Sequence, residues 1–196
     1  MSLQFLWLEK ASSQPKQLKL KRCVVIDYDD TILPTSFIME HTLAKEENYA
    51  NVPILARHDN TLVDAITRMP DYHIYIITNA SMEWLKTTMN NYLPNFARQT
   101  RLLHRCGYLN IFSARQYAQK EVNADVPVSE WKKRTFADKL SDCAEIISLG
   151  DMLYEHEALD AMSEKNDSLV AKKLWFKEKP SLHELTTEWE NFERLW

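Results

Sequence analysis

Short apolar runs alternate along the chain with longer segments of helical periodicity, and this alternation limits the folds that the chain can adopt. The runs are rich in Val, Ile and Leu, with Val24 to Ile26 and Ile74 to Ile77 as the clearest examples. Continuous runs of this composition are typical of parallel strands that are buried on both faces. The sequence therefore predicts an α/β fold in which a central parallel sheet is flanked by helices.

Strand and helix ranges follow from these two patterns. The expected strands are Cys23 to Ile26, His73 to Ile77, Leu109 to Phe112, Glu145 to Leu149 and Leu169 to Phe176. The expected helices are Asn60 to Arg68, Met82 to Tyr92, Ser129 to Leu140, Glu155 to Met162 and Ser181 to Phe192, several of them capped by Ser or Asn. The polar stretch Gln116 to Pro127 is expected to be a surface loop.

Length and charge predict one domain that acts on neither nucleic acid nor membrane. The 196 residues suit a single domain, 1–196, with an N-terminal extension over 1–20 and a C-terminal helix within 180–196. The formal net charge of -4 disfavours a nucleic-acid partner. Because no segment approaches the roughly 18 apolar residues of a membrane span, none is expected. We expect a monomer in the cytoplasm, although export into another cell stays open.

Glycine and cysteine usage excludes several kinds of active site. Only Gly107 and Gly150 occur, too few for a dinucleotide-binding fingerprint or a P-loop. Cys23, Cys106 and Cys143 have no Arg six places later, as a cysteine-based phosphatase would need. Three scattered cysteines predict reduced thiols in a cytoplasm-like compartment.

Polar side chains follow the expected strands, where the carboxyl ends of parallel strands form ligand sites. The first strand leads into an acidic turn, the second into a hydroxyl and an amide, and the fourth into Gly-Asp, while two lysines open a helix before the fourth strand. These residues are Asp27, Asp29, Asp30, Thr78, Asn79, Lys132, Lys133, Gly150 and Asp151. Crowded carboxylates repel one another, so a hard divalent cation such as Mg²⁺ is implied.

This order of Asp-x-Asp, Thr, Lys and Gly-Asp resembles the haloacid dehalogenase-like (HAD) superfamily over Cys23 to Phe176. The resemblance implies a Rossmann-like HAD fold without a large cap domain. It also implies that Asp27 is a nucleophile that forms an aspartyl-phosphate, and that Asp29 is the general acid and base. Thr78 would bind a phosphoryl oxygen, and Lys132, with Lys133 as the alternative, would balance the charge.

The same resemblance implies a Mg²⁺ site made by the Asp27 carboxylate, the Asp29 main-chain carbonyl and Asp151. We expect Tyr28 and Asn79 to contact substrate. Two positions depart from the family pattern, because Asp30 stands where many members have Gly and Glu155 stands where Asp is common. Asp30 is expected to alter the metal geometry, and Gly150 to allow a sharp turn from strand into site.

An open site favours a phosphoprotein substrate, since little of the chain is left over to form a cap. Phosphotyrosine is the preferred form, because its long rigid side chain can reach a strand-end Asp. The alternatives are a small-metabolite phosphatase for sugar phosphates or nucleotides, a nucleic-acid end phosphatase and a non-catalytic phosphoprotein-binding module. A receiver domain of a response regulator is disfavoured, because that family places its acidic residues before the phosphorylated Asp, whereas in this chain Asp151 follows Lys132.

The basic run Arg98, Arg101, His104 and Arg105 is expected to be a solvated helix face.

Overall fold

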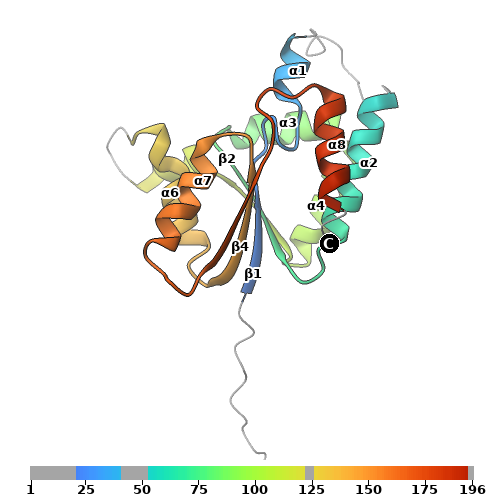
Figure 1. The fold of residues 1–196 in the computed structure, drawn as a ribbon. Coiled ribbons are helices and arrows are strands. Elements are labelled where there is room, and N and C mark those ends of the chain that lie inside the picture. Colours follow the sequence, from blue (N-terminus) through green and yellow to red (C-terminus); the bar gives the residue numbers. More distant parts are fainter. Residues whose placement is uncertain (1–20, 41–52, 122–125, 194–196) are drawn as a thin grey trace, which may run out of the picture.

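The computed structural model describes residues 21–40, 53–121 and 126–193, and its centre is one sheet of five parallel strands (Figure 1). The strand order is β3-β2-β1-β4-β5. The strands are β1 (Lys21–Ile26), β2 (His73–Thr78), β3 (Leu109–Ser113), β4 (Cys143–Gly150) and β5 (Val170–Trp175). The helices are α1 (Thr35–Glu40), α2 (Pro53–Thr67), α3 (Met82–Tyr92), α4 (Pro94–Arg105), α5 (Ala114–Glu121), α6 (Val128–Lys139), α7 (Leu153–Ser163) and α8 (Leu182–Glu193). The α/β architecture with a central parallel sheet is therefore confirmed.

Helices cover both faces of the sheet, and alternate side chains of β1 enter the two resulting cores. Val24 and Ile26 pack with the helices α2, α3, α4 and α8, whereas Cys23 and Val25 pack with α5, α6 and α7. Figure 1 shows α6 and α7 on one side of the sheet and α2 and α8 on the other. Because both faces are covered, each central strand needs the continuous apolar run seen in the sequence.

All five expected strands are present. The helix expected over Met82 to Tyr92 is found with these ends as α3, and the other four expected helices are found with shifted ends. The main extension is α2, which begins at Pro53, since Pro is well accepted in the first helical turn. The loop expected over Gln116 to Pro127 is wrong in its first part, where α5 runs to Glu121. Ala114 and Ala118 of α5 are fully buried and lie one helical turn apart, so these two small residues form the buried face of the helix. Residues 122–125 lie outside the described part.

Two cysteines form a disulfide, which corrects the expectation of reduced thiols. Cys23 on β1 and Cys143 on β4 are bonded, with their Cα atoms 6.3 Å apart. The two residues are separated by 120 positions, and they become neighbours only because β4 pairs with β1. Cys106 is free and exposed.

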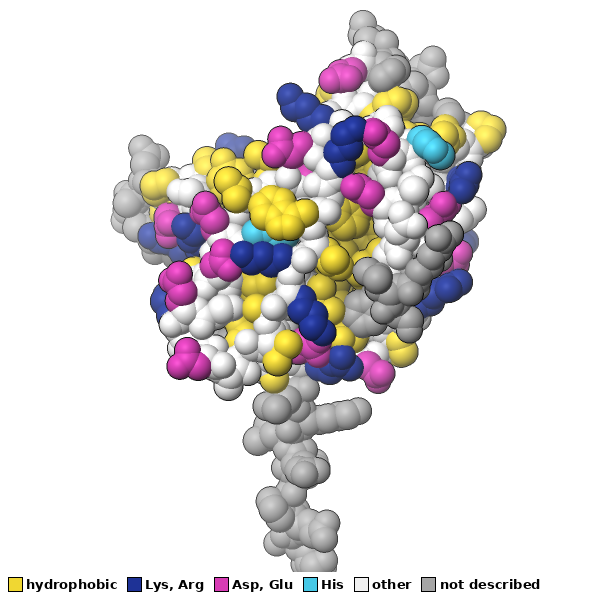
Figure 2. All heavy atoms as spheres, viewed as in Figure 1, with side chains coloured by type: hydrophobic (Ala, Val, Ile, Leu, Met, Phe, Trp, Pro, Cys, Tyr) yellow, Lys and Arg dark blue, Asp and Glu magenta, His cyan; other side chains and the backbone are white. Residues whose placement is uncertain are grey.

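Charged side chains are spread over one face of the molecule (Figure 2), and the carboxyl edge of the sheet carries no separate domain among the described residues. Acidic and basic side chains are interspersed on the face shown in Figure 2. Within the described ranges, no cap domain stands over the carboxyl edge of the sheet. None of the described helices is both long enough and apolar enough to cross a membrane.

A buried histidine predicts that the fold loses stability in acid. His58 on α2 is 0% exposed, its Nε2 lies 2.8 Å from the Ile32 carbonyl oxygen, and burial lowers its pKa to about 4. The unfolded chain binds this proton at about pH 6.5, so the stabilisation is lost as pH falls from 6.5 towards 4. We expect urea unfolding to show a loss of about 2 to 3 kcal/mol between pH 7 and pH 4.5 that His58→Gln lacks.

His183 is the matched control, because it is exposed on α8. His183→Gln should keep the acid sensitivity of the wild type. Equal acid sensitivity in the wild type and in His58→Gln would contradict the prediction.

Candidate active site

The ends of three neighbouring strands meet at one edge of the sheet. Asp27 follows β1, Thr78 ends β2 and Asp151 follows β4, and the strand order reverses between β1 and β4. Ligand sites of open parallel sheets lie at such a reversal. A cavity of about 330 Å³ opens here, lined by Asp27, Asp29, Asp30, Thr78, Asn79, Lys132, Asp151, Met152, Tyr154, Glu178 and Lys179. Of the expected site residues, the structure thus brings together Asp27, Asp29, Asp30, Thr78, Asn79, Lys132 and Asp151 in this cavity, whereas Tyr28 and the alternative lysine, Lys133, do not line it.

Lys132 of α6 is buried between two carboxylates. Its Nζ lies 2.7 Å from Asp27 Oδ1 and 2.7 Å from Glu155 Oε2. Burial acts to lower the pKa of Lys132, but the charges of Asp27 and Glu155 outweigh it and hold that pKa above its usual value. A fully buried cation needs such partners. Lys132 is therefore a fixed positive charge beside Asp27.

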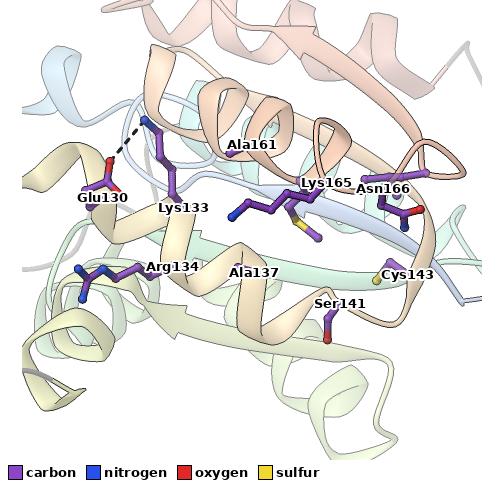
Figure 3. A pocket seen from close by; sticks show the side chains of 11 residues that line it. Glu130, Lys133, Arg134, Ala137, Ser141, Cys143, Ala161, Lys165 and Asn166 are labelled. Atoms are coloured by element: carbon purple, nitrogen blue, oxygen red, sulfur yellow. Dashed lines mark ion pairs between the residues drawn. The ribbon is translucent and has the colours of Figure 1, made fainter.

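The side chain of Lys133 leaves α6 on a different side from that of Lys132. It points into a separate cavity of about 350 Å³ between α6 and α7 (Figure 3). There its Nζ lies 3.5 Å from Glu130 Oε1 and 3.2 Å from Glu157 Oε2. The structure therefore places Lys132, and not Lys133, next to Asp27.

Glu155, four residues after Asp151, holds Lys132 in position. The sequence pattern did not indicate this role of Glu155. Its Oε2 accepts from Lys132, and its Oε1 accepts from the Met152 amide at 3.0 Å. The Glu155 side chain lies over Gly150, where a Cβ atom would come within 1.9 Å of Oε1. Gly150 is thus required by this close approach rather than by a sharp turn.

Three buried carboxylates form a group that could hold a metal ion. Asp27, Asp151 and Glu155 each offer an oxygen within 4.8 Å of the others. Burial, followed by the charge of Asp27, raises the pKa of Asp151 to about 7. Lys132 alone does not neutralise this group. An all-oxygen donor set with excess negative charge fits a hard divalent cation.

Asp29 has a different environment from Asp27. It is half-buried, and its Oδ1 accepts hydrogen bonds from Thr35 Oγ1 at 2.7 Å and from Trp84 Nε1 at 3.0 Å. Burial raises the pKa of Asp29, while the two hydrogen bonds act in the opposite direction. Because both donors engage Oδ1, they orient the carboxyl group without occupying Oδ2. Nothing in the sequence marked Trp84, which reaches Asp29 only through the packing of α3.

Two other residues of the same turn, Tyr28 and Asp30, make contacts that stabilise the fold. Tyr28 is 0% exposed, and its hydroxyl lies 2.8 Å from Thr88 Oγ1 in the core, so it does not line the cavity. Asp30 adopts a left-handed φ of 54°, a conformation that glycine adopts most readily. Its Oδ1 accepts from the Ser36 amide at 2.8 Å, and it is not a member of the metal-binding group of described residues. Asp30 therefore anchors the start of α1, while its charge adds to the burial and the charge of Asp27 that raise the pKa of Asp151.

Thr78 and Asn79 offer neutral polar groups to the cavity. Thr78 Oγ1 accepts from the Ala80 amide at 2.9 Å, which leaves its own O–H group to donate. Asn79 Oδ1 is buried and has no hydrogen-bond partner among the described residues. Both groups are therefore available to a ligand.

The outer rim of the cavity comes from segments that the sequence did not connect with the site. Tyr154 belongs to α7, and Glu178 and Lys179 follow β5. Lys179 has a left-handed φ of 46°.

Comparison of the chain with protein-family models, with curated proteins and with solved structures finds no match. The function of the chain is therefore inferred from the geometry of the site.

Proposed function

We propose that the protein is a HAD-type, Mg²⁺-dependent phosphatase that hydrolyses phosphomonoesters through an aspartyl-phosphate. The observation that carries this proposal is the contrast between two acids of one turn. Asp27 lies 2.7 Å from the buried Lys132, whereas Asp29 is oriented by Thr35 and Trp84. Such a pair of differently held carboxyl groups can divide the work of nucleophile and proton donor.

In the first step, a carboxylate oxygen of Asp27 attacks phosphorus, and the bond from phosphorus to the leaving oxygen breaks. Asp29 donates its proton to that oxygen through Oδ2, the atom that Thr35 and Trp84 leave free. Lys132 balances negative charge beside the reacting carboxylate, and Thr78 donates a hydrogen bond to a phosphoryl oxygen. Fixed donors and charges of this kind are the largest catalytic contribution in many enzymes.

In the second step, water attacks phosphorus and the bond from phosphorus to Asp27 breaks. Asp29, now ionised, accepts the proton of that water. Asp27 returns as a carboxylate, and inorganic phosphate leaves. The raised pKa of Asp29 suits a group that must hold a proton in one step and accept one in the next.

The proposed Mg²⁺ would be held by the carboxylates of Asp27 and Asp151 and by the main-chain carbonyl of Asp29. When bound, it would neutralise the phosphate and bring its oxygens towards Asp27. The carboxylate oxygens of Asp27 and Asp151 lie close enough together to hold a metal ion, and Mg²⁺ is the ion that the proposed chemistry would use. Glu155 remains the partner of Lys132.

The favoured substrate is a phosphoprotein, with phosphotyrosine ahead of phosphoserine and phosphothreonine. A cavity of about 330 Å³ at a sheet edge that no cap domain covers within the described ranges has room for one phosphorylated side chain while the rest of a protein stays outside. A small-metabolite phosphatase is the second candidate, since the rim residues Tyr154 and Lys179 could contact a small ligand directly.

A substrate panel tests the proposal. Phosphotyrosine, phosphoserine and phosphothreonine peptides are compared with sugar phosphates and nucleotides, in Mg²⁺ and in chelator, with Asp151→Asn as the metal-site variant. We expect phosphotyrosine peptides to be hydrolysed fastest, and hydrolysis to stop in chelator. Faster turnover of a metabolite would overturn the substrate, and peptide binding without turnover would indicate a binding module instead.

Replacing Asp29 should separate the two steps. In Asp29→Asn, 4-nitrophenyl phosphate can still transfer its phosphoryl group, because nitrophenolate leaves without a proton. The second step then lacks its base, and steady-state turnover should fall by roughly 10² to 10³. Stopped-flow absorbance should show a burst of about one nitrophenolate per protein. A proportional loss of both phases would contradict the role of Asp29.

A further inference from the structure

Helices α3 and α4 enclose a groove beside the candidate site, with a volume of about 500 Å³. Its floor is apolar. Leu85 and Met89 of α3 and Ala97 of α4 are buried there, and Ile111 of β3 closes it. A mostly apolar concavity of this size is typical of sites that bind side chains of a ligand.

The rim of the groove is positively charged. Lys86 of α3 and Arg101, His104 and Arg105 of α4 line it and are exposed, and no acidic residue is among its lining residues. Among the residues that the structure describes, none of these four side chains forms an ion pair. The basic run is solvated, as the sequence predicts, and three of its four members, Arg101, His104 and Arg105, line this groove.

One end of the groove lies close to the site along the chain. Met82 lines the groove and comes three residues after Asn79, so their Cα atoms are at most about 11 Å apart. From Met82 to Asn90 the groove follows α3 for about 12 Å. An extended peptide with its phosphorylated residue in the site would therefore need about three residues to reach the groove.

We propose that this groove docks a segment of the phosphoprotein substrate that carries both acidic and apolar side chains, an inference that rests on the proposed function. The apolar side chains would pack on the floor, where Met89 can adapt to different shapes. The acidic side chains would face Arg101 and Arg105 on the rim. No Phe, Tyr or Trp lines the groove, so the stacking surface that single-stranded nucleic acid uses is missing there.

Paired peptides test the docking site. Two phosphotyrosine peptides are compared. In the acidic peptide the sequence Glu-Leu-Glu-Leu lies on each side of the phosphotyrosine, beginning three residues away from it. In the basic peptide Lys-Leu-Lys-Leu takes the same two places. The double variant Arg101→Glu/Arg105→Glu should lower kcat/KM for the acidic peptide roughly tenfold and leave 4-nitrophenyl phosphate unchanged. Arg98→Glu is the matched control, because Arg98 is exposed on the same helix but does not line the groove. It should change neither value more than about twofold.

Binding of the unphosphorylated acidic peptide, followed by fluorescence anisotropy, separates docking from catalysis. The double variant Arg101→Glu/Arg105→Glu should bind it more weakly than the wild-type protein does, even if no phosphopeptide is hydrolysed and the proposed function fails. Equal kcat/KM and equal binding for the acidic and basic peptides would overturn the docking site. So would an equal effect of Arg98→Glu. Binding of an oligothymidylate, or self-association, that depends on Arg101 and Arg105 would assign the groove to another occupant.

Discussion

Replacing Asp27 by Asn should reduce phosphatase activity by at least about 10⁴-fold, because the amide cannot form the covalent intermediate. The amide has nearly the shape of the carboxyl group, and Lys132 keeps Glu155 as a partner at 2.7 Å. The loss should therefore appear in kcat, measured with 4-nitrophenyl phosphate in saturating Mg²⁺, while the fold persists.

Circular dichroism and thermal unfolding of Asp27→Asn provide the control for that fold. Asp64→Asn on α2 is a matched substitution outside the cavity, and it should keep wild-type activity. Activity of Asp27→Asn within tenfold of the wild type would show that another group attacks phosphorus.

Removing the buried cation should have the second largest effect, this time on stability. Lys132→Met leaves Asp27 and Glu155 buried without their shared partner, and breaking a buried pair from one side costs about 3 to 5 kcal/mol. Lys133→Met removes only solvent-accessible pairs with Glu130 and Glu157, so it should leave the stability nearly unchanged. Urea unfolding at pH 7 in chelator measures both changes.

The same two variants should also differ in catalysis. Lys132→Met should lose about 10³-fold in kcat with the loss of the fixed charge beside Asp27, whereas Lys133→Met should retain wild-type turnover. Comparable stability of the two variants would contradict the buried arrangement of Lys132.

The sheet and the strand-end residues could be predicted from the sequence for a physical reason. A parallel strand covered on both faces must be apolar throughout, so the run Val24 to Ile26 is visible without knowledge of its partners. The end of each run then locates Asp27, Thr78 and Asp151, because polar groups there meet at one edge. The order of these residues indicated a shared site before any contact was known.

Other features depend on packing that no local pattern records. Trp84 reaches Asp29 only because α3 lies beside the turn after β1, and the disulfide of Cys23 requires β4 to be its neighbour. The sequence suggested that Gly150 allows a sharp turn, but in the structure the missing Cβ atom of Gly150 leaves space for the side chain of Glu155. Tyr28 follows Asp27 in sequence, but the turn directs it into the core.

Chemical trapping of the intermediate tests the central proposal most directly. Asp29→Asn is mixed with 4-nitrophenyl phosphate and Mg²⁺, quenched, reduced with borohydride and digested for mass spectrometry. An acyl phosphate is reduced to an alcohol, so the account predicts homoserine at position 27 only when substrate is present. Unmodified Asp27 after a measured burst, or reduction at another acid, would contradict it.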